Sequence, residues 1–308
     1  MPADIDGAQQ GTSVRRLCLE RLQRRRLGAN RKMRQLTQSV VLSLFACLTA
    51  SAQVNTKATP DKTESGFTFG QQRSWFFWSF LPDEDGVKGD TAESLGLEFE
   101  NYANVGGLHI KNITYFEVNL YPRPIPGQPP GNPGSGTEAR NGINDILTGF
   151  WVSKQGEHHG KHHFSFGPAF MFPSATHSSL GSGKWSAGPT IDYEFSSGRL
   201  FAGTIALNVW SFAGDSNRKD VNMFMAKPFV VYSLDKNWDL LYMPYGISIY
   251  WNKPKGEKAY VPLGGGIQRH LRVGALPLNV SAQLFNNVVR PTKGTKWDLR
   301  FMLEIVLN

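Results

Sequence analysis

Apolar and polar residues alternate along most of the chain beyond about residue 67, in segments separated by short polar turns. A period of two places successive side chains on opposite faces of a strand. The segments are close to the ~9–11 residues that a tilted transmembrane strand needs. The pattern predicts twelve strands, at 67–80, 92–102, 109–121, 143–154, 162–172, 184–195, 199–212, 220–233, 237–251, 258–269, 277–288 and 297–307.

The last segment shows the two faces most clearly. Every second residue on one face is apolar or aromatic, and the polar face carries Asp298, Arg300 and Glu304. The first face suits hydrocarbon and the second suits a polar lumen. Because hydrocarbon cannot solvate unpaired strand edges, such a sheet must close on itself. The members of the apolar face are Trp297, Leu299, Phe301, Leu303, Ile305 and Leu307.

The connections between the predicted strands fall alternately into two sets. One set is mostly short, and the other is longer and includes the Pro/Gly-rich stretch Pro122–Gly142. Short periplasmic turns and long outer loops are typical of outer-membrane barrels with both termini in the periplasm. A soluble β-sandwich would also have many strands, but it would need neither an export signal nor tryptophans at segment ends. Those tryptophans are Trp185, Trp251 and Trp297 at the expected outer side and Trp238 at the inner side.

The composition is compatible with this fold. The chain has 308 residues, of which 40% are hydrophobic, and its mean hydropathy is −0.32. Beyond the N-terminal region no run approaches the ~20 apolar residues of a membrane helix. Averaged hydropathy does not detect a barrel wall, because alternate residues face the lumen and are often polar.

The net charge of +8 reflects mainly the N-terminal region. Residues 1–52 hold nine of the 33 Lys/Arg and three of the 25 Asp/Glu, which leaves 24 basic and 22 acidic residues in the rest. A basic excess confined to a segment that we expect to be removed does not indicate a nucleic-acid partner. Cys18 and Cys47 lie in the same segment, so the mature chain has no disulfide and no cysteine metal site.

The N-terminal region reads as an export signal. A basic stretch ending at Arg34 precedes the apolar core Val40–Ala50, and Ala50-Ser-Ala52 provides a cleavage site. We therefore expect a signal peptide at 33–52 and a periplasmic lead-in at 53–66, ahead of a barrel at 67–308. Residues 1–32 are predicted to be an extension upstream of the true start at Met33, or a disordered basic tail.

Alternation also selects a set of side chains that should line the lumen. Acids and bases are mixed in this set, and buried charges need partners. The set therefore predicts a cross-lumen network of salt bridges, a constricted polar passage whose charges select the solute, or both. We expect Arg300 and Lys227 to pair with carboxylates among Asp192, Glu194 and Glu304. The full set is Glu98, Glu100, Glu117, Asp145, Lys184, Asp192, Glu194, Asn208, Lys227, Gln283, Arg300 and Glu304.

Four histidines in a predicted periplasmic turn are weak candidates for metal ligands: His158, His159, His162 and His163. Imidazoles bind Zn²⁺ or Cu²⁺, but on a strand these side chains would point to opposite faces. A solvated polar turn is the favoured interpretation, so no metal and no cofactor is expected.

A small-residue loop brings His177 near Ser174, Ser178 and Ser179 in sequence. Serine and histidine on a barrel wall are found in hydrolases that act on lipids, but this loop offers no evident acid to orient the histidine. We expect no enzymatic activity and keep a lipid-acting barrel enzyme as the alternative hypothesis.

The region from about Phe170 to Leu303 resembles a family of outer-membrane barrels named after a MetA pathway of phenol degradation, also labelled transporters and, mistakenly, neuromedin U. The resemblance implies an outer-membrane location in a Gram-negative-type bacterium and passage of small molecules, aromatic ones included. It supplies no binding residues. The stretches that carry it are Phe172–Thr176, Leu180–Pro189, Asn208–Asp215, Asp220–Asn222, Val261–Gly266, Asn287–Pro291 and Trp297–Phe301.

The combined prediction is an all-β antiparallel transmembrane barrel of about twelve strands that acts as a passive channel. Its expected partners are outer-membrane lipid, the barrel-assembly machinery during insertion and a small-molecule solute, with no nucleic acid. A structural barrel with a plugged lumen is a further alternative.

Overall fold

The computed structural model describes residues 67–83, 91–120, 141–155, 161–178, 180–292 and 294–307. These residues belong to one compact unit, Ser65–Asn308. The predicted extension at 1–32, the signal peptide at 33–52 and the lead-in at 53–66 lie outside the described residues. Within the described ranges, no helix has the length and apolar character needed to cross a membrane.

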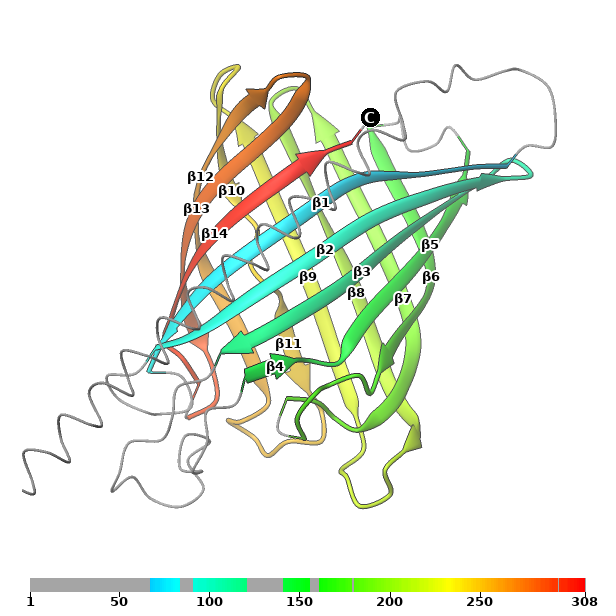
Figure 1. Cartoon of the computed structure of the whole chain (residues 1–308), viewed down its shortest axis with the longest axis vertical. Coiled ribbons are helices and arrows are strands. Elements are labelled where there is room, and N and C mark those ends of the chain that lie inside the picture. The colour runs from blue at the N-terminus through cyan, green and yellow to red at the C-terminus, as the bar shows by residue number, and fades with distance from the viewer. Residues whose placement is uncertain are drawn as a thin grey trace, which may run out of the picture. The chain divides into compact units, whose positions relative to one another are not determined.

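The described chain is built of strands and their connections (Figure 1). Most strands keep an apolar or small residue at every second position, which favours a pleated, half-buried backbone. The strands are β1 (Phe67–Pro82), β2 (Thr91–Val105), β3 (Leu108–Leu120), β4 (Asn141–Ile143), β5 (Ile146–Lys154), β6 (His162–Phe172), β7 (Lys184–Ser197), β8 (Leu200–Gly214), β9 (Asn222–Ser233), β10 (Trp238–Tyr242), β11 (Ile247–Tyr250), β12 (Ala259–Val273), β13 (Leu276–Val289) and β14 (Trp297–Val306).

All fourteen strands form one antiparallel sheet that closes on itself. Neighbouring positions of the wall follow the order of the sequence, and β14 pairs with β1 from Arg73↔Val306 to Phe80↔Leu299 (Figure 1). β4 and β5 both pair with β3 and together fill one position of the wall. β10 and β11 likewise share the position between β9 and β12. The prediction of a twelve-stranded antiparallel barrel is therefore confirmed.

The connections separate the two ends of the barrel. We call the end with connections 83–90, 121–140, 173–183, 215–221, 251–258 and 290–296 the long-loop rim, and the other end the short-turn rim. At the short-turn rim, Gly106 and Gly107 have φ values of +54° and +81°. Positive φ at both central residues belongs to the type I′ turn, whose twist matches that of the two flanking strands.

The outward surface of the barrel is apolar. On β14, Trp297, Leu299 and Phe301 are about two-fifths exposed, while Ile305 on the same face is covered. Exposed aliphatic and aromatic side chains continue round the wall on β6, β7, β12 and β13. A soluble monomer rarely exposes so large an apolar surface. This surface is suited to contact with hydrocarbon.

Tryptophans flank the apolar surface at the ends of strands. Trp185, Trp251 and Trp297 lie at the long-loop rim, each more than two-fifths exposed, and Trp238 begins β10 at the short-turn rim. Indole rings favour the boundary between hydrocarbon and headgroups, where the ring stays apolar and the N–H stays wet.

Inward side chains alternate with the outward ones. On β7, Lys184, Ser186 and Asp192 are buried, whereas Trp185 and Ile191 between them are exposed. The barrel interior thus carries charged and polar groups out of contact with the surrounding hydrocarbon, and these groups bond to one another across the lumen.

Candidate functional site

An ion pair crosses the middle of the lumen. Lys227 on β9 bonds to Glu98 on β2, and these two strands lie six positions apart in the ring of twelve, on opposite walls. The Lys227 ammonium also lies 5.3 Å from the centre of the Tyr115 ring. A charged pair held in this way across a barrel narrows the passage at that level.

A break in the wall places a second bridge beside this ion pair. The residues between β10 and β11, 243–246, leave the ladder, and the N–H of Met243 donates to the inward side chain of Gln283 at 3.0 Å. Tyr245 then reaches the opposite wall, where its hydroxyl donates to Glu117 at 3.2 Å and its ring meets Tyr115 edge-on at 5.5 Å. We call residues 243–246 the lumen segment.

The sequence explains why the ladder breaks there. Pro244 has no N–H to donate, and it is fully buried. Gly246 has a φ of +153°, which disfavours residues with a side chain. Across the break on β12, Gly265 has a φ of +157°, and an added Cβ there would lie 3.0 Å from the Leu241 carbonyl oxygen. The two glycines let the wall bend as the lumen segment turns inward.

Glu117 and Arg300 hold the lumen segment from two sides. Glu117 accepts hydrogen bonds from Ser94 and from Asn144, in addition to the one from Tyr245. The Arg300 guanidinium lies 5.6 Å from the Tyr245 ring centre and binds the Asp298 carboxylate at 3.1 Å. The lumen segment is therefore anchored by groups from β3 and β14.

Two further charge clusters lie nearer the short-turn rim. Lys111 on β3 bonds to Asp192 and, at 2.8 Å, to Glu194, both on β7. In the other cluster, Glu304 is 3.6 Å from Arg73 and accepts a hydrogen bond of 2.7 Å from Asn279. Each buried carboxylate in these clusters faces a cation or an amide, which is the arrangement that makes charge tolerable away from water.

Part of the interior is apolar. Ala169, Leu207, Val209, Met223 and Met225 form a buried cluster on β6, β8 and β9. A cavity next to this cluster has the Glu98–Lys227 pair and the Tyr115 and Tyr245 side chains in its lining. Its apolar lining is supplied by Ile113, Leu147, Trp151, Ile205, Leu207 and Met225. A mostly apolar pocket with a few convergent polar groups is the usual form of a small-molecule site.

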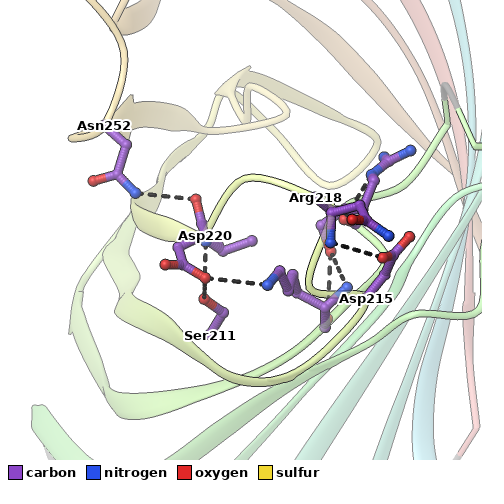
Figure 2. A network of polar contacts seen from close by, with 9 residues as sticks. Ser211, Asp215, Arg218, Asp220 and Asn252 are labelled. Carbon is purple, nitrogen blue, oxygen red and sulfur yellow. Dashed lines mark hydrogen bonds and ion pairs between the residues drawn. The ribbon is translucent and has the colours of Figure 1, made fainter.

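The long-loop rim is tied together by polar contacts, shown in Figure 2. Asp220 accepts a hydrogen bond from Ser211 at 3.2 Å and pairs with the Lys184 ammonium at 3.2 Å. These contacts hold the pKa of the exposed Asp220 carboxyl below its usual value, the hydrogen bond from Lys184 having the largest effect. The carboxylate is therefore ionised at neutral pH, and the ion pair persists there.

Arg218 joins two of the loops at this rim. Its guanidinium donates to the carbonyl oxygens of Ser178 at 2.7 Å and Ser182 at 3.2 Å, and also to that of Gly181. Asn252, from a third loop, donates to the carbonyl oxygen of Asp220 at 3.0 Å (Figure 2). The loops 173–183, 215–221 and 251–258 are thereby linked into one layer.

Most of the side chains predicted for the lumen are buried and bonded inside the barrel. Glu98, Glu117, Asp192, Glu194, Lys227, Arg300 and Glu304 take part in the contacts described above, Gln283 accepts from Met243, and Lys184 pairs with Asp220. Glu100 is buried on β2, on the same face as Glu98. Whether a solute meets these groups remains a prediction.

The expected partners of the two lumen cations were wrong. Lys227 pairs with Glu98, and Arg300 with Asp298. The expected carboxylates are bonded elsewhere: Asp192 and Glu194 to Lys111, and Glu304 to Arg73. Lys111 was absent from the predicted set although it shares the alternation of Glu117 on β3, and that alternation could have identified it.

Asn208 also differs from the prediction, whereas the inward placement of Asp145 stays a prediction. Leu207 and Val209 are the buried, inward residues of this part of β8, so Asn208 between them lies on the outward face. There its side chain accepts the indole N–H of Trp251 at 2.8 Å. Asp145 lies between β4 and β5 and accepts the N–H groups of Ala175 at 3.2 Å and Ser182 at 2.6 Å. Its carboxylate thus holds loop 173–183.

The histidine turn is only partly described, because His158 and His159 lie outside the described residues. His162 is exposed and bonds to the Tyr193 hydroxyl at 2.9 Å, whereas His163, next to it on β6, is buried. The two described imidazoles therefore point to opposite faces. Among the described residues no group of three or more His, Cys, Asp or Glu is placed to hold a metal ion.

The Ser/His loop has a structural contact at its first serine. The Ser174 hydroxyl accepts the N–H of Ile146 at 2.8 Å and lies 3.3 Å from the carbonyl oxygen of Asn144. These bonds fasten the start of loop 173–183 to the junction of β4 and β5.

Comparisons with known proteins give structural neighbours but no sequence family. No family model matches the chain, and no curated protein matches it. The resemblance to the MetA-pathway barrels therefore stays a prediction. Among solved structures, the chain is similar to an outer membrane channel from Pseudomonas putida F1, with 11% identity and a TM-score of 0.49, covering 81% of this chain and 100% of that one. It is also similar to the NanC porin, with 9% identity and a TM-score of 0.44, covering 76% of this chain and 99% of that one.

Proposed function

We propose that the chain is an outer-membrane barrel that lets small molecules pass passively, apolar and aromatic ones included. The closed wall, its apolar exterior and the rims of tryptophan support a position in a membrane. The long-loop rim would then face the outside and the short-turn rim the periplasm. Lipid would surround the wall, and the barrel-assembly machinery would insert it.

The main support for the channel proposal is the cavity inside the barrel. A twelve-stranded barrel is wider than those that side chains fill completely. Here the cavity is lined by Trp151, Leu207, the Glu98–Lys227 pair and Tyr245 of the lumen segment, so the two bridges that cross the lumen adjoin it. A cavity adjoining a constriction is the arrangement expected of a selective passage.

The test uses the purified full-length barrel in liposomes. Swelling in small uncharged sugars, with exclusion of larger ones, is the expected result. Fractionation to the outer membrane and a mobility shift on unboiled gels would support the location, whereas recovery as a soluble periplasmic monomer would refute it.

A closed structural barrel is the second candidate, favoured by the two bridges across the lumen. The two functions predict different behaviour when the Tyr245 bridge is removed. A channel should swell liposomes faster as Tyr245→Gly than as wild type. A structural barrel would give no flux with either protein.

A further inference from the structure

The cavity beside the central ion pair has an unusual charge balance. In the described part of the chain, Glu98 and Lys227 are the charged residues that line it, and they pair with each other. The remaining polar side chains of the lining belong to Tyr115 and Tyr245, and the rest of the lining is aliphatic, indole or thioether. The cavity therefore presents no uncompensated charge to a bound molecule.

That balance decides which molecules the cavity can hold. An ion that enters a largely apolar cavity loses its hydration and needs a counter-charge in return. Here each charge of the lining is already paired, so an ion would have to break the pair. An uncharged molecule has no such cost. It can place an apolar body against Leu207 and Trp151 and direct one hydrogen-bonding group towards the Glu98–Lys227 pair.

Buried apolar side chains pack between the cavity and the long-loop rim. Val209 on β8 and Met223 on β9 lie closer to the long-loop rim than Leu207 and Met225. Tyr250 of β11 packs against the same cluster. Methionine side chains are unbranched and adapt to ligands of different shape. The side chains of this cluster are almost fully buried and form the apolar packing behind one side of the cavity, whereas the facing wall carries Gln283 and Arg300.

We infer that this cavity is a binding site for uncharged small molecules that have an apolar body and a single hydrogen-bonding head, and that it discriminates against ions of either sign. The inference deepens the proposed passage function and rests on it for the biological role, but binding can be measured without flux. Glu98 and Lys227 act as the specificity-determining pair, since each cancels the charge of the other.

The test measures binding of three matched probes to the full-length barrel in lipid nanodiscs by fluorine NMR. The probes are 4-fluorobenzyl alcohol, 4-fluorobenzoate and 4-fluorobenzylammonium, and empty nanodiscs correct for partition into lipid. The alcohol should bind at least about tenfold more tightly than either ion, since about 1.4 kcal/mol of discrimination corresponds to tenfold. Equal binding of the three probes would overturn the inference.

Two wall variants test the location of the site. Leu207→Trp should fill the cavity and weaken alcohol binding by about tenfold or more. Ala206→Trp is the matched control, because Ala206 is paired with the outward-facing Ile191 and its side chain faces lipid. Unchanged binding in Leu207→Trp, or an equal loss in both variants, would place the probe elsewhere.

Charge variants test the specificity pair. Lys227→Met leaves Glu98 alone and should turn the preference towards the ammonium probe, while Glu98→Gln should turn it towards the benzoate. The double variant Glu98→Gln/Lys227→Met restores charge balance and should again prefer the alcohol, which keeps the test decisive if a single variant fails to fold. Failure of these reversals refutes the inference even if liposomes swell, whereas reversals without swelling refute only the passive channel.

Discussion

At the scale of single residues, the energetic problem of this barrel is buried charge. Arg300 is 3% exposed and depends on Asp298, on the Ser79 hydroxyl at 3.1 Å and on three aromatic rings. Removing one partner of a buried pair leaves the other charged and uncompensated, which typically costs about 3–5 kcal/mol. Pairing thus matters more here than the number of charges.

Arg300→Ala should lower the temperature at which the barrel loses its compact form on unboiled gels, while leaving insertion intact. Asp298 would remain buried without its cation, and the rings around the guanidinium would lose their contact. Arg269→Ala is the control, since Arg269 is exposed and lies 5.1 Å from the Trp238 ring at the short-turn rim. Equal loss in the two variants would contradict the role given to burial.

Cysteine labelling tests whether the side chain at position 300 faces the lumen. Cys18 and Cys47 precede the barrel, and a background with both replaced by serine has no other thiol. A cysteine at 300 should react with a water-borne maleimide that reaches the lumen, and cysteines at 299 or 301 should be shielded by lipid. The reverse pattern would invert the register of β14 and the lumen with it.

Lys111 offers a pH-dependent test. Lys111→Met leaves Asp192, which is fully buried, and Glu194 as neighbouring carboxylates without their cation. The variant should lose thermal stability at neutral pH, and the loss should shrink in mildly acidic buffer because protonation removes the unpaired charges. Lys154→Met, at an exposed position, should show no comparable loss at either pH. A deficit independent of pH would contradict this explanation.

Residue identity alone did not reveal the partners inside the lumen. Alternation predicts that Lys227 faces inward, but its partner Glu98 lies on the opposite wall, and sequence spacing carries no information about which residues meet across a ring. Asn208 was misplaced for a related reason. The prediction assumed that a polar residue faces the lumen, whereas this part of the lumen is apolar and the outward position lies at a wet rim beside Trp251.

At the scale of elements, the strands themselves were predicted closely. The segment 162–172 agrees in full with β6, and most other strands differ by one to four residues at their ends. Period-two patterns define a wall well because one face must meet hydrocarbon. The predicted strand 237–251 is in fact β10 and β11 with the lumen segment between them. Pro244 and Gly246 were the available signals, but they could not show that the backbone turns inward.

The lumen segment should control the width of the passage. Tyr245→Gly removes the ring that meets Tyr115 and the hydroxyl bound to Glu117, so single-channel conductance in planar bilayers should rise severalfold. Tyr245→Phe keeps the ring and loses only the hydrogen bond, and its conductance should lie between the two. Tyr242→Phe is the control, since the Tyr242 hydroxyl bonds to the Pro262 carbonyl oxygen at 2.9 Å within the wall. Unchanged conductance in Tyr245→Gly would show that the lumen segment is not the constriction.

At the scale of the whole molecule, the barrel has two chemically different ends. Cysteines placed at Lys255 in loop 251–258 and at Lys236 in connection 234–237 would distinguish them. In intact cells an impermeant maleimide should label position 255 only, and after lysis it should label both. Labelling of position 236 in intact cells would reverse the proposed orientation.

The pairing of β1 with β14 has a kinetic consequence. Arg73 and Val306 are neighbours in the wall although more than two hundred residues of chain separate them. Each of the other joints links strands that are close in sequence and can zip up locally, but this one requires the two extremes of the sheet to meet. Joining distant segments costs loop-closure entropy before any contact repays it. We therefore expect the meeting of β1 and β14 to be the slow step of assembly, and until it occurs both strands keep an edge that can pair wrongly.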